Sequence, residues 1–307
     1  MAAHTNSGHP HILLATDRAP GAQDHLAFAA KLANKLGARI TLYHAVPKVS
    51  LVINAPLAES PADAAESFED TQRSLAETAS TLVADRPVHA IVEQVSDAKD
   101  AILAAADRLE ADLIVLPTHG RSGLSRAVLG SVAEQVVRRA TKPVLLLTDH
   151  MLANAKPDGE VEGPMVIATD LSPASIDAHQ AAVSFAQRLG LPVRLLSVVT
   201  DPLTLPVEGD VPIVPEASDP KPALEARTKR LREMALAIDA HTPIDVEAQI
   251  AHNPVDTIIE RAKDLHAPFL VLTTHGRRGI LRMLQGSVAE QVVRRASTPV
   301  LVMPVAQ

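Results

Sequence analysis

The sequence GSVAEQVVRRA occupies residues 130–140 and returns, letter for letter, at residues 286–296. Each copy follows the tetrapeptide Thr-His-Gly-Arg, which begins at Thr118 in the first case and at Thr274 in the second. The two copies stand 156 positions apart, from 130 to 286, which is about half of the 307-residue chain. Arrays of short repeats recur every 20–50 residues or so. The spacing therefore predicts two copies of one whole domain.

Apolar segments on either side of these copies predict alternating strands and helices in both halves. In the first half, strands are expected at 12–16, 39–46, 88–95, 113–116 and 144–147, with helices at 22–36, 63–85, 98–110 and from the end of the 117–130 loop to 140. The second half has strands at 165–169, 193–199, 244–250, 269–272 and 300–303, and helices at 175–189, 222–240, 254–266 and 286–296. Such alternation implies a parallel, doubly wound α/β sheet in each half. We expect one domain over 1–149, a second over 164–307, and a polar linker over 150–163.

Two local sequence patterns add detail to the prediction for the second half. The strand at 244–250 alternates apolar with polar residues, so one face is expected to be wet, as suits an edge strand. The pair Asn253-Pro254 predicts a helix start, with the asparagine as N-cap and the proline as the first helical residue.

The amino-acid composition argues against several classes of function. Hydrophobic residues make up 47% and charged residues 21%, as in ordinary globular proteins. Aromatic residues are only 2% and the net charge is −7, which argues against nucleic-acid binding. The absence of cysteine excludes disulfides and thiolate chemistry. No run approaches the roughly 18 apolar residues of a membrane span, and no apolar signal core opens the chain, so a cytoplasmic location without membrane contact is expected.

Each repeated segment is a glycine-containing loop that runs into a helix. Gly120 lies just past a strand, and Gly130-Ser131 opens a helix, where unpaired backbone N–H groups and the helix dipole favour anions. A basic residue, Arg121, lies in the loop and could neutralise phosphate charge. The second copy supplies Gly276, Arg277, Gly286 and Ser287. The alternative is a tight turn followed by a helix cap, which would also look duplicated.

A second repeated element is Ala-Thr-Asp, which contains Thr16-Asp17 in the first half and Thr169-Asp170 in the second. Each aspartate lies at the carboxyl end of its domain's first strand, where open α/β sheets bind ligands. A carboxylate there could accept hydrogen bonds from a ribose or from an adenine amine. The alternative is that each aspartate caps the helix that follows.

Together these features resemble tandem universal stress proteins over almost all of both halves. The resemblance rests on the strand followed by Thr-Asp, the Thr-His-Gly-Arg segment, the nine-residue gap, Gly-Ser-Val-Ala-Glu, and a last strand beginning Pro-Val-Leu. It implies five-stranded parallel sheets of order 3-2-1-4-5 with helices on both faces. It also implies that the final strands, 144–147 and 300–303, pair across a homodimer or a pseudo-dimer.

Nucleotide-binding members of that family carry Gly, two residues, Gly, nine residues, Gly, then Ser or Thr. In this chain Pro117 and Thr273 stand at the first glycine position. Proline removes a backbone N–H and adds a ring, whereas threonine keeps the N–H. The second domain is therefore expected to be the better nucleotide site, and the two sites are expected to differ. The backbone of the adenine pocket should map near Val46 and Val198.

The resemblance implies a stress-response protein that binds ATP or a related adenine nucleotide and acts as a ligand-sensing module for an unknown protein partner. At most weak hydrolysis is expected, with Mg²⁺ only as the counter-ion of ATP and no metal site of the protein's own. One alternative is a family member that binds no nucleotide and works through protein–protein contacts, which Pro117 and Thr273 favour. The other is an enzyme, such as an ATPase or a nucleotidyl transferase.

Overall fold

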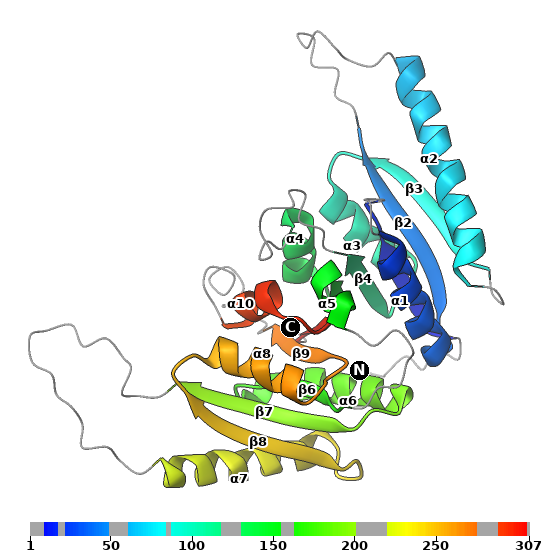
Figure 1. Cartoon of the computed structure of the whole chain (residues 1–307). Helices are drawn as coiled ribbons and strands as arrows, with labels where there is room; N and C mark the ends of the chain where they lie inside the picture. Colours follow the sequence, from blue (N-terminus) through cyan, green and yellow to red (C-terminus); the bar gives the residue numbers. More distant parts are fainter. Residues whose placement is uncertain are drawn as a thin grey trace, which may run out of the picture. The chain divides into compact units, whose positions relative to one another are not determined.

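The computed structural model describes residues 9–17, 22–48, 61–83, 87–117, 130–154, 163–200, 220–274 and 288–305, of which 61–66, 153, 154 and 274 are described by backbone alone. These residues fall into two compact units (Figure 1). The described residues up to Leu152 form the first unit, and those from Ala153 onward form the second.

The first unit is built on a parallel sheet whose strands lie in the order β3-β2-β1-β4-β5. The strands are β1 (His11–Ala15), β2 (Arg39–Pro47), β3 (His89–Val95), β4 (Leu113–Pro117) and β5 (Val144–Leu147). The helices are α1 (Ala22–Leu36), α2 (Pro61–Leu82), α3 (Ala98–Arg108), α4 (Ser131–Arg139) and α5 (Asp149–Asn154). Helix α1 contacts α2, and α3 contacts α4. Right-handed crossovers that reverse direction after β3 place these two pairs on opposite faces of the sheet.

The second unit repeats this plan, with strands in the order β8-β7-β6-β9-β10. Its strands are β6 (Met165–Ala168), β7 (Val193–Thr200), β8 (Ile244–Ala251), β9 (Leu270–Thr274) and β10 (Val300–Pro304). Its helices are the short η1 (Pro173–Ser175), α6 (Ile176–Leu189), α7 (Lys221–Ile238), α8 (Pro254–Asp264) and α10 (Val288–Arg295). Both units thus confirm the expected strand order 3-2-1-4-5 and the parallel α/β class.

Each core is formed by largely apolar strands under alanine-rich helices. Every residue of β1, β5 and β6 is buried, as expected of parallel strands that are covered on both faces. Small side chains let the helices approach the sheet closely, and Ala29 on α1 and Ala182 on α6 are completely buried. These cores fix where the strands end, and the ends of the strands carry the candidate site.

The residues expected to begin a polar linker form a short helix instead. Helix α5 spans Asp149–Asn154, and the Met151 backbone N–H donates to Thr148 Oγ1 at 3.1 Å. Threonine is a good N-cap because its oxygen accepts one of the unpaired N–H groups of the first turn. Met151 is also buried. The cap and this apolar anchor explain why the chain stays helical here.

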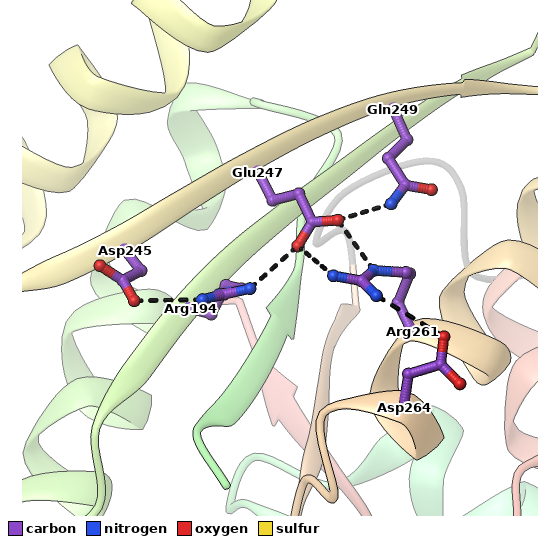
Figure 2. A network of polar contacts seen from close by, with 6 residues as sticks. All are labelled: Arg194, Asp245, Glu247, Gln249, Arg261 and Asp264. Carbon is purple, nitrogen blue, oxygen red and sulfur yellow. Dashed lines mark hydrogen bonds and ion pairs between the residues drawn. The ribbon is translucent and has the colours of Figure 1, made fainter.

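Strand β8 lies at the edge of its sheet, as expected, but its polar face is not simply wet. Asp245 is exposed, whereas Glu247, which accepts from Arg194 and Arg261, and Gln249, which donates to Glu247, are half-buried (Figure 2). None of the described helices combines the length and the apolar character that a membrane crossing requires.

Candidate functional site

The predicted Thr-Asp elements lie at the carboxyl ends of β1 and β6, in the same setting in both units. The backbone N–H of Thr16 donates to the Tyr43 carbonyl at 2.9 Å, and that of Thr169 donates to the Leu196 carbonyl at 2.9 Å. The strand order reverses beside these points, because β1 has β2 on one side and β4 on the other, and β6 has β7 and β9. Ligands of open α/β sheets bind outside the strand ends at such a reversal.

In the first unit, an imidazole reaches the threonine carbonyl. His44 Nδ1 lies 2.6 Å from the Thr16 carbonyl oxygen. A carbonyl can only accept a hydrogen bond, so Nδ1 carries the proton, and in the neutral imidazole Nε2 is then an acceptor. Asp17 is exposed immediately beyond Thr16. The residues that follow Asp17, 18–21, lie outside the described part, so the alternative that Asp17 caps helix α1 stays open.

In the second unit, a hydroxyl and a guanidinium take the place of the imidazole. Ser197 Oγ donates to the Thr169 carbonyl at 2.8 Å, and Arg227 Nε donates to Ser197 Oγ at 2.9 Å. Arg227 Nη2 donates to the Asp170 carbonyl at 3.3 Å. Burial lowers the pKa of Arg227 below its usual value, the nearby Arg230 lowers it further, and the Asp170 carboxylate opposes both. Arginine stays charged under all ordinary conditions, so α7 brings a cation to the ends of β6 and β7.

Asp170 closes a tight turn rather than capping a helix. The backbone N–H of Ser172 donates to Asp170 Oδ1 at 2.9 Å, and that of Leu171 donates to Thr169 Oγ1 at 3.0 Å. Leu171 has φ 67°, a left-handed conformation that is uncommon for a residue other than glycine. The N-cap of α6 is Ser175, so the helix-cap alternative for Asp170 is wrong. Unusual backbone conformations concentrate at functional sites.

The repeated glycine loop is described only where it enters helix α4. Gly130 is the N-cap of α4, with φ −59° and ψ 145°, and Ser131 is the first helical residue. The Ser131 side chain is therefore not the N-cap of α4. A Cβ on Gly130 would have no described atom within 4 Å, so neither backbone conformation nor packing among the described residues requires glycine there. The other predicted loop residues lie outside the described part: Gly120, Arg121, Gly276, Arg277, Gly286 and Ser287.

The two valines expected at the adenine pocket lie on the second strand of each unit, and both are half-buried. Val198 directly follows Ser197 and so lies beside the contact with Arg227, whereas Val46 is two residues beyond His44. The structure therefore places Thr169, Asp170 and Val198 near the carboxyl ends of two neighbouring strands, β6 and β7. Among the described residues, no group of three or more His, Cys, Asp or Glu side chains is placed to hold a metal ion.

Sequence reasoning missed three residues of this site: His44, Ser197 and Arg227. The first two precede the predicted adenine-pocket positions by one or two residues, so a closer reading of the second strands could have found them. Arg227 stands among other charged residues on a long helix, and no local pattern separates it from them.

Comparison with known proteins places both halves in one family. The model of the universal stress protein family matches residues 9–148 and again 163–304. The chain is 30% identical, over 297 residues, to a universal stress protein of Mycolicibacterium smegmatis, which covers 95% of this chain and 96% of that protein. A universal stress protein of Mycobacterium tuberculosis strain H37Rv is 27% identical over 332 residues, covering 100% and 98%. The fold matches a solved universal stress protein from Archaeoglobus fulgidus with a TM-score of 0.68 at 18% identity, covering 96% of this chain and 98% of that one.

Proposed function

This chain belongs to the universal stress protein family, as two domains in tandem, and from that premise we propose that it senses an adenine nucleotide, ATP or a close relative, and passes the signal to a protein partner. One observation carries the proposal. In each unit, a Thr-Asp pair follows the first strand at the point where the strand order reverses, and its threonine carbonyl is held by a side chain from the second strand.

The roles follow from the position of each group. Asp17 and Asp170, with Thr16 and Thr169 before them, face the adenosine part, together with the backbone at Val46 and Val198. Gly130 and Ser131 bind phosphates at the N-terminus of α4, where backbone donors and the helix dipole favour anions. From sequence, Gly120 and Arg121 join them, as do Gly276, Arg277, Gly286 and Ser287 in the second domain. Mg²⁺ would enter only as the counter-ion of ATP.

The proposal assigns binding rather than catalysis to these residues. Fast phosphoryl transfer needs a group that positions the attacking water or accepts its proton, and none of the residues named above is given that role. Turnover is therefore expected to stay below about 1 per second, the lower end of typical enzyme rates. A faster rate would support the enzyme alternative.

The test begins with mass spectrometry of the small molecules that the purified full chain releases on denaturation, followed by calorimetric titration with ATP. The variant Asp17→Ala is expected to weaken ATP binding to the first domain about tenfold to a hundredfold, because it removes a charged hydrogen-bond acceptor. Asp107→Ala is the control, since Asp107 is exposed near the carboxyl end of α3 and at the opposite end of the sheet.

Absence of bound nucleotide, together with no heat at millimolar ATP, would contradict the proposal. It would favour the second candidate, a member that acts only through protein–protein contacts. One observation favours that candidate: Pro117 is the last residue of β4, where the family's nucleotide-binding pattern has glycine, and its backbone has no N–H to offer a ligand.

A further inference from the structure

The turn that follows β6 carries the site aspartate of the second domain. The backbone N–H of Leu171 donates to Thr169 Oγ1, and that of Ser172 donates to Asp170 Oδ1. Leu171 is buried and has φ 67°, a left-handed conformation that costs free energy in any residue with a Cβ. Such a conformation persists only where the surrounding contacts hold it. The contacts that hold this turn therefore also decide the direction of the Asp170 carboxylate.

Arg227, from helix α7, holds the turn on both sides of Asp170. Its Nη2 donates to the Asp170 carbonyl at 3.3 Å. Its Nε donates at 2.9 Å to Ser197 Oγ, which in turn donates at 2.8 Å to the Thr169 carbonyl. These two carbonyls belong to the peptide groups before and after Asp170. Peptide groups are planar, so their orientations fix both backbone dihedrals of the residue between them.

Arg227 differs in this from the other half-buried arginines in the described part of the chain. Those arginines each form an ion pair with a carboxylate: Arg138, Arg194, Arg261 and Arg294. Figure 2 shows two of them, Arg194 and Arg261, bound to carboxylates of their own domain. Arg227 donates instead to two uncharged oxygens, a hydroxyl and a backbone carbonyl. Hydrogen bonds from a charged donor are stronger than those from a neutral one, which suits Arg227 to hold a strained turn.

A different residue, Thr71, stands at the equivalent position of the first unit. Arg227 lies four residues before the buried Leu231 of α7, and Thr71 lies four residues before the buried Leu75 of α2. The Thr71 hydroxyl donates to the Ser67 carbonyl of its own helix at 2.8 Å. The contact from helix to turn at this position thus belongs to the second domain, and its loss should affect the site of that domain alone.

We propose that Arg227 is a positioning residue of the second-domain nucleotide site, where it holds the Asp170 carboxylate in the direction that the nucleotide requires. The inference rests on the nucleotide-binding function proposed above. Arg227 acts through Asp170 and need not touch the ligand itself. A site whose groups are ordered in advance binds more tightly, because binding then does not include the free-energy cost of ordering them. Helix α7 thereby becomes part of the second site.

The experiment is calorimetric titration of the full chain with ATP in the Asp17→Ala background. That substitution is expected to weaken the first site, so the titration reports the second. Arg227→Met keeps the length of the side chain and removes its donors. It is expected to weaken ATP binding at the second site about tenfold, because the turn loses a charged donor.

A double-mutant cycle separates positioning from a direct contact with the ligand and from a general effect on folding. Asp170→Ala removes the group that Arg227 is proposed to position. Once that group is gone, adding Arg227→Met should change the ATP affinity by less than about twofold, so the two losses are not additive.

Two further variants control for charge and for folding. Arg230→Met removes the same charge from an exposed position three residues along α7 and is expected to leave the ATP affinity unchanged. Arg227→Lys keeps the charge but not the planar fork, so it should recover part of the affinity that Arg227→Met loses. If Arg227→Met fails to fold, Arg227→Lys takes its place in the cycle.

Three results would overturn the inference and leave the proposed function standing. The first is an unchanged ATP affinity in Arg227→Met. The second is an equal loss in Arg230→Met, which would assign the effect to charge alone. The third is a loss from Arg227→Met that is as large in the Asp170→Ala chain, because Arg227 would then act independently of Asp170. A wild-type chain that binds no ATP would overturn the proposed function and this inference together.

Discussion

At the scale of single residues, the site is organised around one carbonyl group in each unit. The carbonyls of Thr16 and Thr169 directly follow their strands and accept hydrogen bonds from His44 and Ser197 on the neighbouring strands. The Thr-Asp pairs themselves could be predicted from sequence because they are adjacent and repeated. Their partners could not, because a side chain on the neighbouring strand is identified only by the register between the two strands.

His11 is expected to make the stability of the first unit depend on pH. Its Nδ1 donates to the Leu109 carbonyl at 2.8 Å, and its Nε2 lies 2.8 Å from Thr41 Oγ1. Burial lowers the pKa of His11 from 6.5, and Arg39 also lowers it, against the opposing effects of the Leu109 carbonyl and Asp112. As the pH falls below 6.5, the unfolded chain takes up the proton before the folded chain does, so the free energy of unfolding falls.

In the variant His11→Leu, the free energy of unfolding should depend less on pH between about pH 7 and about pH 5. Chemical denaturation at a series of pH values measures this. At neutral pH it should cost about 1–3 kcal/mol, because the Leu109 carbonyl and Thr41 lose their partner. His241→Gln, at an exposed position, is the control. An unchanged slope in His11→Leu would contradict this account.

Glycine is required at position 163, just before β6, because the backbone of Leu265 and His266 lies very close to it. It is buried, and a Cβ there would clash with the Leu265 carbonyl oxygen and lie 2.5 Å from the His266 carbonyl oxygen. Gly163→Ala should therefore lower the free energy of unfolding by about 1–3 kcal/mol, the usual cost of overpacking. Gly130→Ala adds the same methyl where no described atom lies within 4 Å, and should cost at most about 1 kcal/mol. Thermal unfolding measures both variants, and an equal loss of stability in Gly163→Ala and Gly130→Ala would contradict the predicted clash.

At the scale of elements, most helices and strands could be predicted to within two or three residues, because periodicity and capping are local. The start of α8 is the clearest case: Asn253 Oδ1 accepts from the backbone N–H groups of Val255 and Asp256 at 3.0 and 3.4 Å, confirming the predicted cap. The polar face of β8 was harder to predict. Its burial depends on Arg261, which comes from a helix and not from the strand itself.

The cap of α8 can be tested directly. Asn253→Ala should reduce the free energy of unfolding by about 1 kcal/mol, because two N–H groups of the first turn lose their acceptor. Glu260→Ala, at an exposed position on the same helix, should change it little. Urea denaturation of the two variants gives the comparison, and a loss in Glu260→Ala as large as that in Asn253→Ala would count against the cap.

The network in Figure 2 ties together β7, β8 and α8. Glu247 accepts from Arg261 Nε at 2.8 Å and Nη2 at 3.0 Å, and from Arg194 Nη1 at 3.2 Å. Burial alone would raise the pKa of Glu247, but hydrogen bonds from Arg261, Gln249 and Arg194 hold it below its usual value. The stabilisation is thus complete above the ordinary carboxylate pKa and is lost as the pH falls through the lowered one.

Glu247→Gln should therefore destabilise the chain at neutral pH by about 1–3 kcal/mol, since two half-buried arginines lose a charged acceptor. The difference from wild type should shrink in acid, where Glu247 itself becomes protonated. Asp245→Asn is the control, because that side chain is 72% exposed and surface pairs contribute about 0–1 kcal/mol. A difference that stays constant from neutral to acidic pH would contradict this role.

At the scale of the whole molecule, the chain carries two α/β units of the same strand order with different polar contacts at equivalent points. The homodimer through the final strands remains a prediction from family resemblance. Light scattering over a range of concentrations tests it, since a dimer has twice the 32.5 kDa mass of one chain. A single-chain mass at every concentration would contradict it.

The amino-acid sequence by itself determined that there are two domains, that each is a parallel α/β sheet, and where the Thr-Asp pairs stand. These features depend on repetition and on apolar periodicity, which are properties of neighbouring residues. Only the tertiary structure decided that Arg227 reaches Ser197, 30 residues before it, and the Asp170 carbonyl, 57 residues before it. Such contacts arise because separate strands end and a helix begins at one edge of the sheet, and the register that aligns them is set by packing of the core.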